Sequence, residues 1–123
     1  MSFDMSFDGE RDVGSPLRWR RGDLIQETYL LAFWQKHYGL HQLICRLNGI
    51  SDAIQATEIP LHEEDLSNLL EAIKSGQMVY DQKMMSLNVY TPEMDIAAIE
   101  FAMNWLEHGP GGGADRWAFY RAA

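Results

Sequence analysis

Two histidines, His37 and His41, stand four residues apart in a segment that the sequence predicts to be helical. At this spacing two imidazoles lie on one helix face and can share a metal ion. A third ligand would have to come from His62 or from the carboxylates of residues 63–65, if a second helix packed beside the first. The favoured interpretation binds no metal. It keeps one histidine hydrogen-bonded in or near the core and the other at the surface.

A second group that could do chemistry is Arg18, Trp19, Arg20 and Arg21. Arginine guanidinium groups bind phosphate or carboxylate through two hydrogen bonds, and an indole offers a stacking surface. The group is therefore a candidate site for a nucleotide-like anion. The preferred alternative pairs these arginines with the acidic second half of the chain and uses Trp19 as a packing anchor.

Other motifs that would indicate catalysis are incomplete. Residues 109–113 read GPGGG, but no strand precedes them and no Lys-Ser/Thr pair follows, so they do not form a phosphate-binding loop. Cys45 lies in no local catalytic motif and is expected to be a buried thiol. We therefore expect a protein that is not an enzyme and needs no cofactor.

The net charge of -8 is unevenly distributed. Residues 1–50 hold six acidic and six basic residues, whereas residues 51–110 hold eleven acidic residues and two lysines, a net charge of -9. Such a surface repels nucleic acid and anionic membranes and attracts a basic partner. The candidate partner-binding residues are Glu63, Glu64, Asp65 and Glu71. The first three also suit the helix dipole at a helix N-terminus.

The length of 123 residues fits one domain. A single cysteine cannot form an internal disulfide, and no apolar run approaches the 18 residues of a membrane span. The polar, acidic start MSFDMSFDGERD lacks the features of a secretory signal, so the cytoplasm is the expected compartment.

Apolar periodicity and capping residues predict three principal helices, over about 23–48, 63–75 and 92–108. The first would be capped by Asp23 and end before Gly49, and the third would be capped by Thr91 with Pro92 at its first position. Residues 59–61 should be extended because the residue before a proline avoids the helical region.

The remaining segments are expected to be less regular. Residues 1–15 are predicted to be an irregular N-terminal arm, and residues 77–90 a mostly irregular middle. The C-terminal segment around Trp117, Phe119 and Tyr120 is too aromatic for a free tail and should dock on the helices. The sequence thus predicts a mainly α protein with a single helical domain over 16–123.

The stretch from Phe33 to His41 resembles a group of small phage and prophage proteins of unknown function. In that group the first helix carries a Trp-x-Lys-x3-Leu-His pattern and the C-terminus is rich in Trp and Tyr. Trp34, Lys36, Leu40 and His41 match the first feature. Gln35 stands where the group has a basic residue, and the Cys- or Gly-rich middle of the group is absent. The resemblance implies a phage-type accessory protein and no particular reaction.

The same residues can be interpreted in two ways. Trp34, Leu40 and His41 could close a core against the aromatic C-terminus, with His41 donating to a buried acceptor. Alternatively, Trp34, Lys36, His41 and Trp117 could form a ligand-binding surface together with the arginine–tryptophan group.

The function predicted from these patterns is non-catalytic. The chain is expected to be a small acidic phage-type protein that binds a host or defence protein with a basic surface, and a homodimer is plausible. The alternative is a protein that binds or sequesters a nucleotide-like anion. Neither membrane nor nucleic acid is an expected partner.

Overall fold

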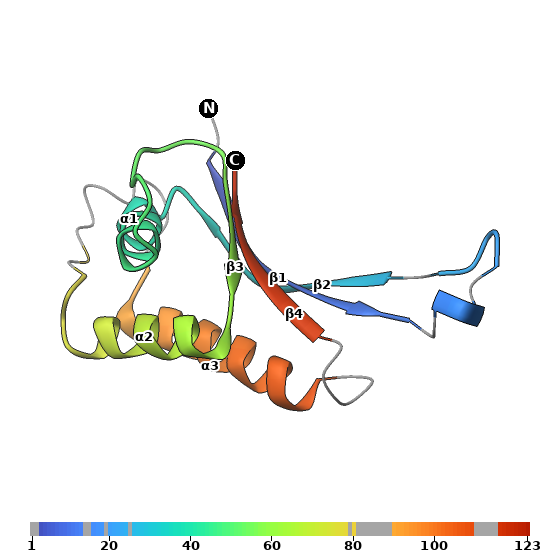
Figure 1. Ribbon diagram of the computed structural model, residues 1–123. Coiled ribbons are helices and arrows are strands. Elements are labelled where there is room, and N and C mark those ends of the chain that lie inside the picture. Colours follow the sequence, from blue (N-terminus) through green and yellow to red (C-terminus); the bar gives the residue numbers. More distant parts are fainter. Residues whose placement is uncertain are drawn as a thin grey trace.

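The computed structural model describes residues 3–13, 16–18, 20–24, 26–78, 80, 90–109 and 116–123. These form a four-stranded antiparallel sheet and three α-helices, an α+β fold (Figure 1). The strands are β1 (Asp4–Asp12), β2 (Gln26–Gln35), β3 (Thr57–Leu61) and β4 (Arg116–Ala122), in the spatial order β2-β1-β4-β3. The helices are α1 (Tyr38–Leu47), α2 (Glu63–Lys74) and α3 (Pro92–His108). The expectation of a mainly α protein is therefore wrong.

The predicted irregular arm over residues 1–15 is instead largely strand β1, which lies in the interior of the sheet. Phe3, Met5 and Phe7 are buried and alternate with polar residues, which is the two-residue period of a strand with one buried face. Since β1 pairs with both β2 and β4, this segment belongs to the domain rather than to an appended arm.

The predicted helix over 23–48 is a strand followed by a shorter helix. Strand β2 occupies Gln26–Gln35, and α1 begins only at Tyr38. The register shifts opposite Phe7 and Asp8, so Leu31 has no partner of its own on β1. This bulge places buried Leu31 and Trp34 three residues apart, a spacing that imitates a helix.

The aromatic C-terminus does not dock on the helices as expected but forms strand β4 between β1 and β3. Arg116, Ala118, Tyr120 and Ala122 are buried, and the residues between them are half-buried. Strands β1 and β4, which are far apart in the sequence, are thus neighbours, so the sheet is complete only when these distant segments have paired.

Helices α2 and α3 begin and end close to the predicted positions, because their capping signals are local. The Thr91 hydroxyl accepts a hydrogen bond from the Met94 backbone N–H, and Pro92 occupies the first turn. At α2, the Asp65 carboxylate accepts from the His62 backbone N–H, and Gly76 follows the helix with a φ of 78°.

The segment over 59–61, expected to be extended, lies in β3. This is an edge strand, where Pro60 removes no hydrogen bond from a second neighbour. The prediction of an irregular middle over 77–90 falls largely outside the described residues, because only residues 77, 78, 80 and 90 of it are described.

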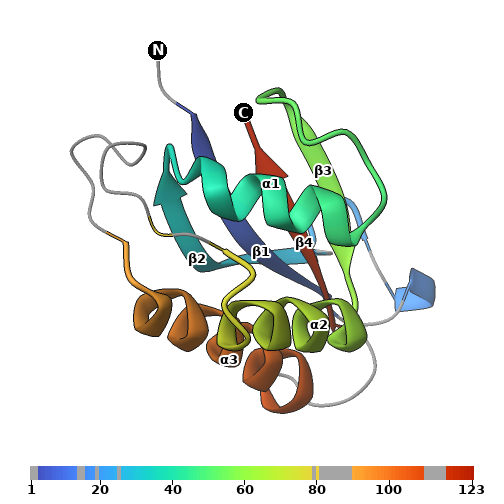
Figure 2. The same ribbon diagram turned by 90° about the vertical axis from the view of Figure 1, so that its left-hand side faces the viewer.

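All three helices lie on one side of the twisted sheet, as the two views in Figures 1 and 2 show. Met5, Phe7 and Tyr120 are completely buried between the sheet and this layer. On the other side, no described helix covers the sheet, and Leu30 and Phe33 are 65% and 52% exposed. An open hollow of about 410 Å³ lies on this side, lined in part by Leu30, Phe33 and Arg121.

Gly9 in β1 allows α3 to approach the sheet. A Cβ atom at this position would lie 2.7 Å from the Cη2 and Cζ3 atoms of the buried Trp105 ring. We expect Gly9→Ala to lower the free energy of unfolding by about 1–3 kcal/mol through overpacking, although alanine is ordinarily the better strand residue. Urea unfolding measures the change.

The matched control places Gly9→Ala on a Trp105→Phe background. The smaller ring should reduce the cost of the added methyl group, which a double-mutant cycle detects. An equal cost in both backgrounds would contradict the assignment to this contact.

Candidate interaction surface

The most constrained polar group is the buried carboxylate of Asp95, in the first turn of α3. Trp34 donates from Nε1 to Oδ1 at 3.0 Å, and the Tyr80 hydroxyl donates to Oδ2 at 2.6 Å. His37 Nε2 lies 2.7 Å from Oδ2. An ionised carboxylate can accept all three bonds. This group, which we call the Asp95 centre, joins α3 to β2 and to the start of α1.

Burial and the bond to Asp95 together raise the pKa of the Tyr80 hydroxyl, so the proton stays on the phenol at neutral pH. His37 also stacks on Tyr90, with ring centroids 4.4 Å apart. Each named member of the centre therefore has a partner within the fold, while Nδ1 of His37 is buried without a hydrogen-bond partner among the described residues.

A second buried polar group surrounds His41. Its Nε2 is 2.8 Å from the carbonyl oxygen of Ala53, so the proton is on Nε2 and Nδ1 accepts from the Tyr120 hydroxyl at 2.7 Å. Cys45 packs beside this ring, and burial raises the pKa of its thiol. His41 is thus a core residue, as one interpretation expected, but its acceptor belongs to Ala53, which is exposed rather than buried.

The two histidines considered as metal ligands are both buried, at 1% and 0% exposure, so the expectation that one lies at the surface is wrong. His37 faces Asp95 and His41 faces Tyr120. His62 is exposed at the start of α2. In the part of the chain that the structure describes, no three His, Cys, Asp or Glu side chains gather into a metal-binding group.

The residues proposed as one ligand surface are dispersed. Trp34 and His41 are buried in different places, and Lys36 follows β2 with a φ of 55°. Trp117 lies in β4, half-buried, and donates to Glu10. Trp19 lies outside the described residues. The described members of this set are therefore not gathered into one surface.

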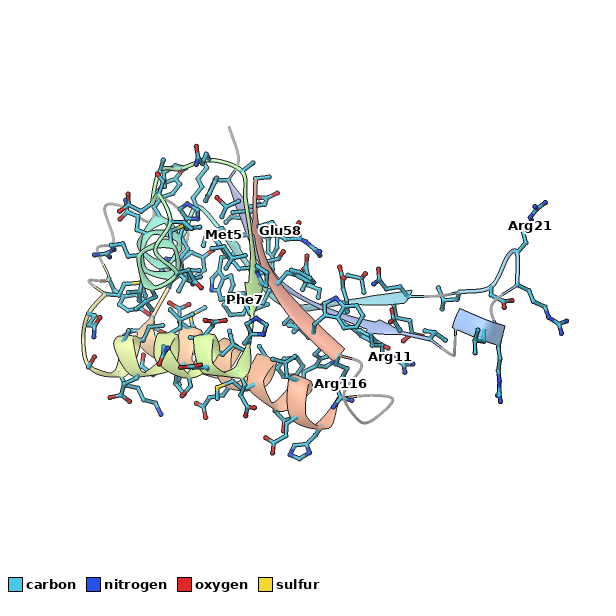
Figure 3. The ribbon with its side chains drawn as sticks, in the orientation of Figure 1. Met5, Phe7, Arg11, Arg21, Glu58 and Arg116 are labelled. Carbon is cyan, nitrogen blue, oxygen red and sulfur yellow. The ribbon has the colours of Figure 1, made fainter. Side chains whose placement is uncertain are left out.

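The arginines of that set stand apart from the body of the protein. Arg18, Arg20 and Arg21, here called the arginine tip, lie in the connection between β1 and β2, which projects away from the helices (Figures 1 and 3). All three are exposed, and Leu17 beside them is 97% exposed. No acidic side chain among the described residues pairs with them, so they do not pair with the acidic helices, contrary to the preferred sequence interpretation.

Four of the six acidic residues on the strands form ion pairs with arginine. Arg121 contacts Asp8, Glu10 and Glu58 at 2.8–3.2 Å. On the other side of the sheet, Glu27 pairs with Arg11, and hydrogen bonds from Tyr29 and Arg11 lower the pKa of its carboxyl group. These carboxylates therefore already have cationic partners within the chain.

The acidic residues of α2 and α3 differ in this respect. Their exposed members are Glu63, Glu64, Glu71, Glu93, Glu100 and Glu107, which we call the acidic layer. Among the described residues, the only side-chain ion pair recorded for this group joins Glu107 to His108 at 3.5 Å. Asp65 is half-buried and bonds to the His62 backbone. The structure therefore brings three of the four predicted partner-binding residues, Glu63, Glu64 and Glu71, into one acidic layer.

Sequence reasoning did not single out the α3 glutamates or the Asp95 centre. The glutamates recur every seven residues, at 93, 100 and 107, which could have been noticed. Asp95 is in step with the apolar positions Ile99 and Ala102, and an acid on an apolar stripe is the available signal for a buried carboxylate.

Comparison with known proteins finds no matching family model, no similar curated protein and no similar solved structure. Over the described residues, no helix has the length and apolar character needed to cross a membrane.

The Asp95 centre yields a stability prediction. Asp95→Ala leaves the buried Trp34 and His37 and the half-buried Tyr80 without their acceptor, and we expect a loss of about 3–5 kcal/mol in the free energy of unfolding. Tyr80→Phe removes one bond and should cost about 1 kcal/mol. Urea unfolding of both variants tests this ranking, and equal losses would show that the carboxylate does not organise the centre.

Proposed function

We propose that this chain is a non-catalytic binding protein whose acidic layer engages a basic surface on a partner protein. The proposal is carried by a contrast between two groups of carboxylates. Four carboxylates on the strands pair with arginine, whereas the exposed carboxylates of α2 and α3 have no cationic partner at ion-pair distance among the described residues, apart from the Glu107–His108 contact. Carboxylates left without internal cations remain available for cations of another molecule.

Electrostatic attraction would raise the rate of association with a basic partner and favour that partner over acidic proteins. Like-signed charges gathered on neighbouring helices act together on an approaching partner, and complementary charge raises the association rate. At physiological ionic strength the interaction is screened beyond about 8 Å, so the attraction should depend strongly on salt.

The proposed partner class is a host or defence protein, and the proposed compartment is the cytoplasm. The phage-type assignment is supported by the motif resemblance alone. Its residues Trp34, Leu40 and His41 are buried and hold the fold, so the binding surface is argued from the acidic layer and not from the motif.

Affinity capture from bacterial lysate tests the proposal. The immobilised protein should retain a partner at about 50 mM salt and release it at about 300 mM, because the Debye length falls over this range. The variant Glu63→Gln/Glu64→Gln/Glu71→Gln should lose most of this capture, because it removes half of the acidic layer.

A matched control removes three carboxylates elsewhere. Asp4→Asn/Asp52→Asn/Glu58→Gln changes the net charge equally, and its positions are exposed and lie outside α2 and α3. It should retain the partner. Salt-insensitive capture, no capture, or an equal loss in both variants would refute the proposal.

A second candidate function is contact with a phosphate-bearing anion at the arginine tip, favoured by its exposed guanidinium groups. A nucleotide at about 100 times its Kd would stabilise the protein by about 2.7 kcal/mol in a thermal-shift series. Arg21→Gln should reduce the shift, whereas Arg46→Gln, an exposed arginine on α1, should not. No shift with mono-, di- or cyclic nucleotides would eliminate this candidate.

A further inference from the structure

Helix α3 has an exposed face with a regular composition. Its inner face packs into the core through Asp95, Ile99, Ala102 and Trp105, all of which are buried. The residues of the outer face are exposed, and their types recur at regular intervals along the helix. They are Glu93, Met94, Ala97, Glu100, Phe101, Asn104, Glu107 and His108.

These exposed positions fall on a seven-residue repeat. Met94, Phe101 and His108 share one position of the repeat, and Ala97 and Asn104 share another. In a coiled coil these are the two positions that face the partner helix. Met94 and Phe101, at 51% and 55% exposure, are large apolar side chains that the chain's own core does not use.

One side of this face carries only carboxylates. Glu93, Glu100 and Glu107 each directly precede a residue of the first position, which is the flanking position that forms interhelical ion pairs in coiled coils. The apolar row of this face consists of Met94, Ala97 and Phe101. We call the outer face, which comprises this row and the three glutamates, the α3 seam. It runs for about 22 Å, or four helical turns.

The charge of the seam determines which helix fits it. A second copy of this chain packed antiparallel would place glutamates against glutamates, which is unfavourable. A helix with an apolar stripe flanked by lysine or arginine would bury Met94 and Phe101 and pair all three carboxylates.

We propose that the α3 seam is the docking site for a basic amphipathic helix of the partner protein. The inference rests on the proposed function and makes it specific, since it names one helix of the acidic layer and the secondary structure of the partner. Affinity comes from the apolar row, and the glutamates set orientation and salt dependence.

The test uses the full chain and two synthetic peptides of about 18 residues, with identical leucine and lysine content. In one peptide the leucines form a helical stripe flanked by lysines, and in the other the order is scrambled. Fluorescence anisotropy at about 50 mM salt should show at least about tenfold tighter binding of the striped peptide. Equal affinities, or no binding, would overturn the inference.

Two phenylalanine variants locate the contact. Phe101→Ser should remove most of the preference for the striped peptide, whereas Phe33→Ser, of similar exposure on the uncovered face of the sheet, should leave it unchanged. Equal effects of both variants would also overturn the inference.

Lysate capture separates this inference from the proposed function. If Phe101→Ser still captures a partner that salt releases, the seam is refuted and the proposed function stands. If the wild-type protein captures no partner that salt releases, the proposed function itself is refuted.

Discussion

The carboxylate of Asp95 is the constraint on which the arrangement of the helical layer depends. It is completely buried, and its neighbours on β2, at the start of α1 and at Tyr80 all direct hydrogen-bond donors at it. A buried charge is stable only while such donors surround it, so α3 cannot rotate about its axis without losing them. With Asp95 turned inward, the helical repeat places Met94 and Phe101 outward. The buried acid therefore fixes which face of α3 reaches another molecule.

The distribution of charge follows from the same architecture. Four carboxylates of the sheet strands pair with Arg121 or Arg11, and these pairs bridge neighbouring strands. The helices contain Lys74 and Arg46 as their basic residues, and neither forms an ion pair with a described residue. Four of the six strand carboxylates therefore have arginine partners, while the glutamates of the acidic layer face the solvent. A net charge that could serve solubility alone is thereby concentrated on one layer of the fold.

How much could be predicted from the sequence depends on whether the determining interaction is local. Helices α2 and α3 were predictable because Thr91, Pro92 and Gly76 act within a few residues of the helix ends. Strands β1, β2 and β4 were not, because their partners lie far along the chain. The bulge at Leu31 gave β2 a helical spacing. The excess of acidic residues in the second half was visible in the sequence, but their separation into paired and unpaired groups depends on where Arg121 lies.

The α3 seam shows what the structure adds to a pattern that is already present in the sequence. Along α3, the row Met94, Ala97 and Phe101 and the row Ile99, Ala102 and Trp105 are both apolar, and periodicity alone cannot tell which row faces the core. Gly9 settles the question, because its missing side chain admits the Trp105 ring against β1. Once Trp105 is buried there, the other row must face away from the sheet. The glutamates beside that row then form the rim of a surface that this chain does not fill by itself.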